Sequence, residues 1–475
     1  MQISVVPFKK IEKEKRIDAE YYQPHLLTYE KNIYNSGMPV VKLGEVIESG
    51  YRVVYENTDI VESPEDESRH VRFLQATNIQ SNLPIVNKYG LGWVTNSDWQ
   101  RYPLGRIKRG EILIEVKGQA EKVAIVPEDY PLNTLVSGSV YKFSVNRNDI
   151  NKHYLLIYLL SKYGHGFRKR CLTNTLIGFV SKDYLYSILL PKPKEDFQKL
   201  IESLSNQIFD FYDNSIKFYS QAEQLLLDEL GLSNWQAKHK LSFIKNYSDT
   251  QQAERIDAEY YQPKYDQITN AIKKYKGGWD KLENLVKIKD KNIKPKEKEI
   301  YKYIELANIS NNGDITGFTE ECGQELPTRA RRRVSKGDVI VSSIEGSLSS
   351  IALVNDNLHN ALCSTGFYVV NSKAINSETL LVLLKSLVGQ LQLKKGCSGT
   401  ILTAISKDEF SKVVLPKLAG GIQEKIRLSI QKMYEARYKS KQLLEIAKKG
   451  VEMAIEKTEA KAEAWIKAEV AKLER

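Results

Sequence analysis

The chain has 475 residues, of which 42% are hydrophobic, so it is long enough for two or three domains with substantial cores. No stretch approaches the roughly 18 apolar residues of a membrane span, the N-terminal sequence lacks the pattern of a signal peptide, and the four cysteines form no C-x-x-C pair. We therefore expect a cytoplasmic protein without a membrane association or a zinc site. A formal net charge of +11 favours a polyanionic partner but does not identify one.

One segment of the chain occurs twice. Residues 16–24 read RIDAEYYQP, and residues 255–263, about half a chain further on, read the same letters. An identity of this length indicates an internal duplication, and its period is far longer than the roughly 20–50 residues of a solenoid repeat. We therefore expect two related, domain-sized units, which suit a target with two related surfaces.

Weaker matches follow the two copies in the same order. The matching pairs are residues 43–47 with 282–286, 71–79 with 301–309, 108–114 with 335–341, 181–183 with 406–408, and 190–192 with 415–417. Apolar framework positions repeat, whereas the stretches between them diverge. Two copies of one scaffold show this pattern when the loops of each copy bind a different ligand.

Each unit is predicted to open with a short helix, because Pro24 and Pro263 suit the first turn of a helix. Short β-rich runs separated by Gly, Asn and Asp follow. The clearest runs are residues 111–116, 122–126, 140–143, 338–341, 351–354 and 367–370, and the predicted internal helices are residues 153–162 and 377–387. The expected fold class is therefore α/β (α+β), with a compact mixed domain in each unit.

A long amphipathic helix is predicted to close each unit. Apolar residues recur at three- and four-residue steps over about residues 195–230, and again from about residue 422 toward the end. The first helix would be ~50 Å long. A helix of this length with one apolar face needs a partner, so we expect the two helices to pack antiparallel as a coiled-coil-like strut.

The predicted domain boundaries follow from these elements. They are residues 1–194 for the first mixed domain, 195–231 for the first long helix, 232–419 for the second mixed domain with its linker at 232–254, and 420–475 for the second long helix and tail.

The sequence lacks the motifs of methyltransferases and nucleotide hydrolases. It has no [DNS]-P-P-[YF], no F-x-G-x-G and no G-x-x-x-x-G-K-[ST], and its histidines show no metal-ligand spacing. Glu115 and Lys117 form an E-x-K string like that of a nuclease core, but residues 342–344 of the second unit read Ser-Ser-Ile at the corresponding place. We therefore expect no catalytic residue, metal or cofactor in this chain. A self-sufficient nuclease is the weakest alternative.

Basic and amide side chains in the variable stretches are the candidate DNA contacts. The densest basic cluster is Arg329, Arg331, Arg332 and Arg333, for which we expect mainly phosphate contacts. Two basic turns correspond in the repeat: Arg168, Lys169 and Arg170 before Thr173 and Thr175, and Lys394 and Lys395 before Thr400. For the arginine cluster the alternative is a solvated charge run.

A second group of candidates carries amides suited to bases. Gln75 with Asn78, and Asn308 with Asn311, have the donor–acceptor pairs that read adenine. Their alternative is hydrogen bonding within a turn or at a strand edge. Lys117 and Gln119 are predicted to lie on a loop that faces DNA.

The repeated segment carries four tyrosines, Tyr21, Tyr22, Tyr260 and Tyr261. A segment that is identical in both halves is unsuited to reading two different DNA sequences. We therefore expect these tyrosines to dock against the helices or against a partner subunit.

The chain resembles the specificity (S) subunit of type I restriction–modification systems. The resemblance rests on the duplicated D-A-E-Y-Y-Q-P segment, the paired G-[DE]-hydrophobic strands, and the S-K-D…L-P-K element that leads into each long helix. It covers nearly the whole chain, in the order framework, variable region and helix, twice. It implies two target-recognition domains held apart by two antiparallel helices, each domain reading one half of a split double-stranded DNA sequence.

The resemblance also implies partners. The S subunit has no catalysis of its own and recruits methyltransferase (M) subunits, expected in two copies here, and restriction (R) subunits; S-adenosylmethionine, ATP and Mg would bind to those partners. Because the loops of the two units diverge, the target should be asymmetric. The alternatives are the recognition subunit of a type IIB-like enzyme, whose methylation and cleavage share one partner chain, and a two-domain adaptor that binds proteins rather than DNA.

Overall fold

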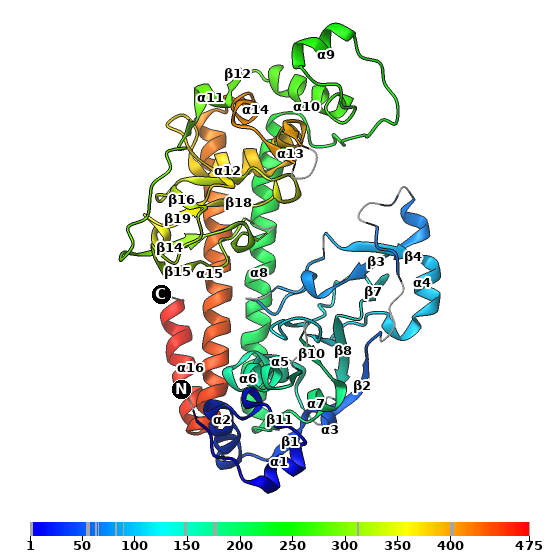
Figure 1. Cartoon of the computed structure of the whole chain (residues 1–475), viewed down its shortest axis with the longest axis vertical. Helices are drawn as coiled ribbons and strands as arrows, with labels where there is room; N and C mark the ends of the chain where they lie inside the picture. Colours follow the sequence, from blue (N-terminus) through cyan, green and yellow to red (C-terminus); the bar gives the residue numbers. More distant parts are fainter. Residues whose placement is uncertain are drawn as a thin grey trace. The chain divides into compact units, whose positions relative to one another are not determined.

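The computed structural model describes residues 3–53, 58–61, 64, 66–80, 83–88, 90–146, 150–173, 178–310, 313–399 and 403–474. The chain forms two compact units, one comprising residues 1–213 with 436–475 and the other residues 214–435. Two long helices, α8 (Glu195–Glu229) and α15 (Gly420–Glu456), each begin in one unit and end in the other (Figure 1). The predicted fold class, two mixed domains with two long helices, is confirmed. The units divide within both long helices, whereas the predicted boundaries lie at the helix ends.

The described residues of unit 1 form short helices and four small sheets of two to four strands. Its helices are α1 (Phe8–Glu14), η1 (Ala19–Tyr22), α2 (Pro24–Asn35), α3 (Leu43–Val46), η2 (Glu67–Arg69), η3 (Ala76–Asn78), α4 (Asn96–Arg101), η4 (Pro103–Gly105), α5 (Lys152–Leu160), α6 (Lys162–Arg170), α7 (Lys182–Tyr186) and α16 (Glu459–Leu473). Its strands are β1 (Val40–Lys42), β2 (Ile47–Tyr51), β3 (His70–Leu74), β4 (Gly92–Thr95), β5 (Ile112–Glu115), β6 (Val123–Ile125), β7 (Thr134–Val136), β8 (Val140–Val145), β9 (Leu172–Thr173), β10 (Phe179–Val180) and β11 (Leu189–Pro191).

Unit 2 repeats this order of elements. Its helices are α9 (Tyr247–Ala253), α10 (Pro263–Lys273), α11 (Leu282–Leu285), η5 (Leu306–Asn308), η6 (Glu345–Ser347), η7 (Asp356–Leu358), α12 (Ser377–Lys385), α13 (Leu387–Lys395) and α14 (Lys407–Ser411). Its strands are β12 (Trp279–Lys281), β13 (Lys287–Ile288), β14 (Ile300–Ile304), β15 (Thr319–Cys322), β16 (Ala330–Arg333), β17 (Val339–Ser342), β18 (Ile351–Leu353), β19 (Leu362–Ser364), β20 (Phe367–Asn371), β21 (Cys397–Ser398), β22 (Ala404–Ile405) and β23 (Val414–Pro416).

The sheets of the two units share one topology. An antiparallel sheet runs β2-β8-β5-β6 in unit 1 and β13-β20-β17-β18 in unit 2. A second sheet runs β4-β3-β7 in unit 1 and β15-β14-β19-β16 in unit 2, and in each the pair β3–β7 or β14–β19 is parallel. The duplication read from the sequence therefore extends to strand order and strand direction. Among the described residues, the second sheet of unit 2 has the additional strand β16, which carries three of the four clustered arginines.

The six β-rich runs predicted from sequence all form strands. Where the sequence predicted one internal helix in each unit, the structure has two short helices. Residues 153–162 and 377–387 each belong to a pair of short helices, α5–α6 and α12–α13. The break comes at Ser161 and Ser386, which are extended and act as the N-caps of the second helices. Serine at these positions is the sequence signal for a new helix start.

The long helices pack against each other inside each unit. In unit 1 the Ser440 hydroxyl of α15 donates to the Ile208 carbonyl oxygen of α8 at 2.8 Å. In unit 2 Leu226 and Ile430 belong to one buried cluster. Early residues of α8 thus pair with late residues of α15 and the reverse, which is the predicted antiparallel arrangement.

The C-terminal tail forms a separate helix. Thr458 is extended, and its hydroxyl accepts from the Lys461 N–H at 3.3 Å, which starts α16. Ile466 of α16 packs directly on Gly450 of α15, so α16 folds back along α15 (Figure 1). No helix in the described part of the chain is both long and apolar enough to cross a membrane.

Each unit has one glycine where the backbones of two consecutive helices come very close, Gly164 in unit 1 and Gly389 in unit 2. A Cβ at Gly164 would overlap the Tyr158 carbonyl oxygen, and a Cβ at Gly389 would overlap the Leu383 and Leu384 carbonyl oxygens. Because these atoms are main chain, they cannot rotate away. The tight helix pairs α5–α6 and α12–α13 therefore require glycine.

We expect Gly389→Ala to destabilise unit 2 by about 1–3 kcal/mol, the usual cost of overpacking. Urea unfolding followed by circular dichroism measures this change. The matched control is Gly421→Ala in α15, where nothing lies within 4 Å of the added Cβ. That variant should be neutral or slightly stabilising, and equal stability of the two variants would contradict the assignment.

Candidate nucleic-acid interface

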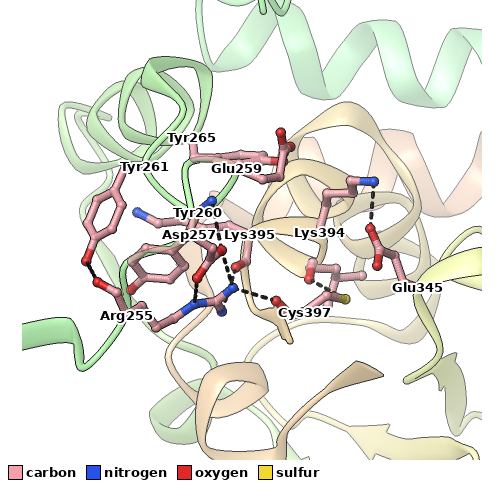
Figure 2. A network of polar contacts seen from close by, with 11 residues as sticks. Arg255, Asp257, Glu259, Tyr260, Tyr261, Tyr265, Glu345, Lys394, Lys395 and Cys397 are labelled. Carbon is pink, nitrogen blue, oxygen red and sulfur yellow. Dashed lines mark hydrogen bonds and ion pairs between the residues drawn. The ribbon is translucent and has the colours of Figure 1, made fainter. Parts of the chain in front are cut away.

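The repeated segment folds in the same way in both units, as a clasp made by its arginine, aspartate and tyrosines. In unit 2 the Arg255 guanidinium pairs with the Asp257 carboxylate at 2.7 and 2.8 Å and donates to the Cys397 carbonyl oxygen at 2.9 Å (Figure 2). The Arg255 guanidinium lies 4.3 Å from the centre of the Tyr260 ring. The Tyr261 hydroxyl donates back to the Arg255 carbonyl oxygen at 2.7 Å.

Unit 1 makes the same contacts. Arg16 pairs with Asp18 at 2.5 and 2.7 Å and donates to the Leu172 carbonyl oxygen at 3.1 Å. The Tyr22 hydroxyl donates to the Arg16 carbonyl oxygen at 3.0 Å. In both units the hydrogen bonds from arginine hold the pKa of the paired aspartate, Asp18 or Asp257, below its usual value. The clasp therefore contains a charged pair at neutral pH.

The clasp contacts the basic turn at the end of α6 in unit 1 and of α13 in unit 2, which the sequence predicted to contact DNA. Leu172 and Cys397 begin β9 and β21, the strands that follow α6 and α13. Arg170 lies 3.9 Å from the centre of the Tyr21 ring and donates to the Tyr21 carbonyl oxygen at 2.9 Å. Lys395 lies 5.0 Å from the centre of the Tyr260 ring.

The four tyrosines thus dock inside their own unit, against the ends of α6 and α13. Tyr21, Tyr22 and Tyr261 are buried, and Tyr260 is half-buried. Burial raises the pKa of Tyr21 and Tyr260, so both phenols stay neutral. These side chains offer little surface to another subunit in this arrangement.

The basic turns themselves are largely occupied by internal contacts. Arg168 is fully buried, and its guanidinium donates to the carbonyl oxygens of Ala120, Glu121 and Leu159. This placement does not support a DNA contact by Arg168, because no base or phosphate can approach a side chain enclosed by its own fold.

The remaining residues of the two turns are closer to the surface. Lys169 pairs with Glu121 at 2.9 Å, and its counterpart Lys394 pairs with Glu345 at 2.7 Å. The Thr173 hydroxyl donates to the Phe179 carbonyl oxygen at 3.1 Å. Thr175 and Thr400 lie outside the described residues.

The predicted base-reading amides form equivalent turns. The Asn78 side-chain oxygen accepts from the Gln75 N–H at 2.8 Å, and the Asn308 side-chain oxygen accepts from the Glu305 N–H at 2.9 Å. Asn78 is buried and also donates to the Gly90 carbonyl oxygen at 3.3 Å. These two asparagines close framework turns after β3 and β14, which is the alternative named for them above.

Gln75 and Asn311 are the other two amide candidates. Gln75 is half-buried at the start of its turn. Asn311 lies outside the described residues.

Lys117 and Gln119 are exposed, and Lys117 forms an isolated antiparallel bridge with Phe179. That these two residues face DNA stays a prediction. The Glu115 carboxylate closes the loop that contains them by accepting the N–H of Glu121 at 3.0 Å. Gly118 has a left-handed φ of 120° and donates its N–H to Gly178 at 2.9 Å. Glu115 therefore has a structural use, and among the residues described no group of three His, Cys, Asp or Glu side chains is arranged to hold a metal.

Arg331, Arg332 and Arg333 lie on β16, and Arg329 immediately precedes that strand. Arg329, Arg331 and Arg333 are exposed, whereas Arg332 is half-buried, donates to the Phe367 carbonyl oxygen and lies 5.6 Å from the centre of the Tyr368 ring. β16 is the last strand of its sheet. Three of the four arginines are thus free to meet a polyanion, and Arg332 fixes the strand.

A groove of about 580 Å³ lies beside β16. Its polar lining includes Asn292, Lys294, Gln324 and Arg331. Asn292, Lys294 and Gln324 were not predicted from the sequence, because residues 292–294 and 324 lie in separate segments that meet only in the fold. The signal that was available was the Lys-rich stretch 287–298, which has no repeat in unit 1.

Unit 1 differs at the equivalent place. There the strand is reduced to a single bridge between Arg106 and Leu135. Arg106 lies 4.4 Å from the centre of the Trp99 ring and donates to the Trp99 carbonyl oxygen at 2.9 Å. The two units therefore share a framework and differ in the polar surface that it carries.

No protein-family model and no curated protein matches the chain. Several solved structures do. One, from a study of complex assembly and conformational transition in the type I R-M system, is 15% identical, covers 92% of this chain and 98% of its own, and has a TM-score of 0.28. The HsdS subunit from Thermoanaerobacter tengcongensis is 14% identical, with coverages of 89% and 97% and a TM-score of 0.29. The type I restriction-modification S subunit from M. genitalium is 12% identical, with coverages of 89% and 96% and a TM-score of 0.36. Because all three TM-scores are below 0.5, we base no conclusion about this chain on them.

Proposed function

We propose that this chain is the DNA sequence-recognition (specificity) subunit of a type I restriction–modification enzyme. The observation that carries the proposal is a scaffold present twice with different polar surfaces. Strand order, the clasp and the asparagine turns recur in both units. The exposed arginines at β16 and the adjoining groove belong to unit 2, whereas at the equivalent place in unit 1 Arg106 packs on Trp99. The resemblance of the sequence to S subunits supports the same function.

Each unit would read one half of a split DNA target. The exposed residues Arg329, Arg331 and Arg333 suit phosphate contacts, which position a protein on the duplex. Gln324 and Asn292 in the adjoining groove have the paired donor and acceptor that base edges require. In unit 1 the candidates are the exposed Lys117 and Gln119, which lie at a different place in the scaffold from β16. Because the surfaces differ, the two half-sites differ and the target is asymmetric.

The long helices would set the distance between the half-sites. α8 and α15 are each shared by both units. In other DNA-binding proteins, a fixed distance between two reading elements fixes the spacing of their half-sites. The gap in the DNA target would therefore be constant.

The chemistry would reside on partner chains. We propose that the chain is not an enzyme and that it recruits two methyltransferase (M) subunits and restriction (R) subunits, which bring S-adenosylmethionine, ATP and Mg. The structural use of Glu115 in closing its loop favours this over a self-sufficient nuclease.

The first test is to co-express the chain with the proteins encoded by its neighbouring genes and to map methylated bases in the host DNA by single-molecule sequencing. We expect one split, asymmetric motif with a constant gap, absent when this chain is deleted. An unchanged methylome with these proteins present and folded would contradict the proposal.

Replacement of Arg329, Arg331 and Arg333 with alanine should weaken DNA binding across all sequences, because these side chains are expected to contact phosphates. The slope of log K against log salt should fall by up to about 3, measured by fluorescence anisotropy at several salt concentrations. Lys373→Ala, at an exposed lysine elsewhere in unit 2, is the control. Loss of discrimination at one base pair without a change of slope would show base reading instead.

Insertion of four residues after Asp213 in α8 and four after Glu435 in α15 adds about one turn to each helix where the units divide. At 1.5 Å per residue the gap in the methylated motif should change by about two base pairs, and both half-sequences should stay the same. The methylome map measures both. A changed half-sequence would contradict independent reading by the two units.

A further inference from the structure

A glutamine near the start of α8 joins three segments of unit 1. The Gln198 side-chain oxygen accepts from the Asn151 N–H at 2.8 Å, and its side-chain nitrogen donates to the Pro193 carbonyl oxygen at 2.9 Å. Asn151 is the N-cap of α5, and Pro193 lies just before α8. Gln198 is buried, so both ends of its amide bind protein groups in place of water. We call this arrangement the amide bridge.

Unit 2 contains the same amide bridge at the start of α15. The Gln423 side-chain oxygen accepts from the Asn376 N–H at 3.0 Å, and its side-chain nitrogen donates to the Leu418 carbonyl oxygen at 3.0 Å. Asn376 is the N-cap of α12. The glutamine and the asparagine are the same residues in both units, whereas the residue that contributes only a carbonyl oxygen differs. The duplication has therefore kept the side chains that the bridge uses.

The bridge acts on the layer between the long helix and the sheets. In unit 2, Leu384 of α12 belongs to one buried cluster with Ile430 of α15 and Val341 of β17. Ile340 lies on the other face of β17, since side chains alternate along a strand, and it belongs to a second cluster with Ile304 of β14. The sheet that contains β16 is thus connected to α15 through α12 and β17.

Hydrogen bonds constrain these layers in a way that apolar contacts do not. The hydrophobic effect holds layers together but has no direction, so packed layers can turn or slide while they stay in contact. A hydrogen bond weakens steeply when its donor and acceptor move out of line. Each amide bridge is therefore suited to fix the angle at which the helix pair, and the sheets packed behind it, lie on the long helix.

The helix pair of unit 1 is also held by the second long helix. The Glu452 carboxylate of α15 accepts from the N–H of Lys162, the first residue of α6, at 2.9 Å, and the Lys162 side chain pairs with Glu456. A carboxylate is stabilising at a helix N-terminus. In unit 2 the N–H of Leu387, the first residue of α13, interacts with Glu223 of α8 and opposes the rise in the pKa of Glu223 that burial causes.

We propose that Gln198 and Gln423 are positioning residues for DNA reading, with Glu452 in the same role in unit 1. They contact no DNA themselves. By fixing each unit on its long helix, they fix the direction in which its reading surface faces, and so restrict the complex to one gap between the half-sites. The inference rests on the proposed function, because only a chain that reads a split target has a gap to restrict.

The test uses the complex formed when the full chain is co-expressed with the proteins encoded by its neighbouring genes. The methylome supplies the motif, and fluorescence anisotropy then measures affinity for three duplexes, with the native gap, one base pair less and one base pair more. One base pair moves a half-site by about 3.4 Å and turns it by about 35°. The measured quantity is the ratio of affinities for the native and altered gaps.

Gln198→Met and Gln423→Met each remove one amide bridge while keeping a side chain of similar length. In each variant we expect the preference for the native gap to fall by about tenfold, because the freed unit can turn to meet a displaced half-site. Both half-sequences should still be required. Glu452→Ala should lower the preference in the same direction, whereas Glu452→Gln keeps an acceptor for the Lys162 N–H and should retain it.

Two controls separate positioning from stability. Gln221→Met makes the same exchange at an exposed position of α8 and should leave the preference unchanged. Ile340→Val lowers the stability of unit 2 without touching the bridge, and it should also leave the preference unchanged. Circular dichroism and the unfolding midpoint establish that each variant is folded. If a methionine variant does not fold, the Glu452→Ala and Glu452→Gln pair makes the same comparison in unit 1.

Folded bridge variants that keep the wild-type preference for the native gap would overturn the inference. An equal loss of affinity for all three duplexes would overturn it too, since that result means that the bridge only stabilises the fold. A wild-type complex that methylates no split motif would contradict the proposed function, and the inference with it. A split motif in the wild type with an unchanged preference in the variants would contradict the inference alone.

Discussion

The pairing of α8 with α15 is the constraint on which both units depend. Each helix supplies part of the core of each unit, so neither helix belongs to one domain alone. The Ser440 hydroxyl bonded to the Ile208 carbonyl oxygen fixes the register on one side, and Leu226 packed in one cluster with Ile430 fixes it on the other. Changes in the surface of a unit leave this pairing intact, which is what a scaffold with exchangeable reading surfaces needs.

The clasp is the second shared element, and it separates two kinds of surface. Its arginine and tyrosines face inward and fix the turn after α6 or α13, through Leu172 in unit 1 and Cys397 in unit 2. Its isoleucine faces water. The same segment can therefore be used in two units that bind different ligands. It contacts the turn after α6 or α13, and the strands and loops that vary between the units lie elsewhere.

Much of the fold was predictable from sequence because it depends on periodicity and repetition. The long helices, the six β-rich runs and the duplicated order all follow from apolar spacing. The candidate site was less predictable, because burial is a property of the folded chain. Arg168 and Lys169 are neighbours in sequence, yet one is enclosed and the other is near the surface. The groove residues Asn292 and Gln324 come together only through the sheet, and no local pattern indicates that.

The division of the molecule has a consequence for how the chain folds during synthesis. Unit 2 is one continuous stretch, residues 214–435, so all of its contacts become available before the last part of the chain is made. Unit 1 needs residues 436–475 against residues that were synthesised first. Closing that loop requires nearly the whole chain, and contacts of such long separation form slowly. A chain that ends just after residue 435 therefore contains every residue of unit 2 but lacks the C-terminal part of unit 1.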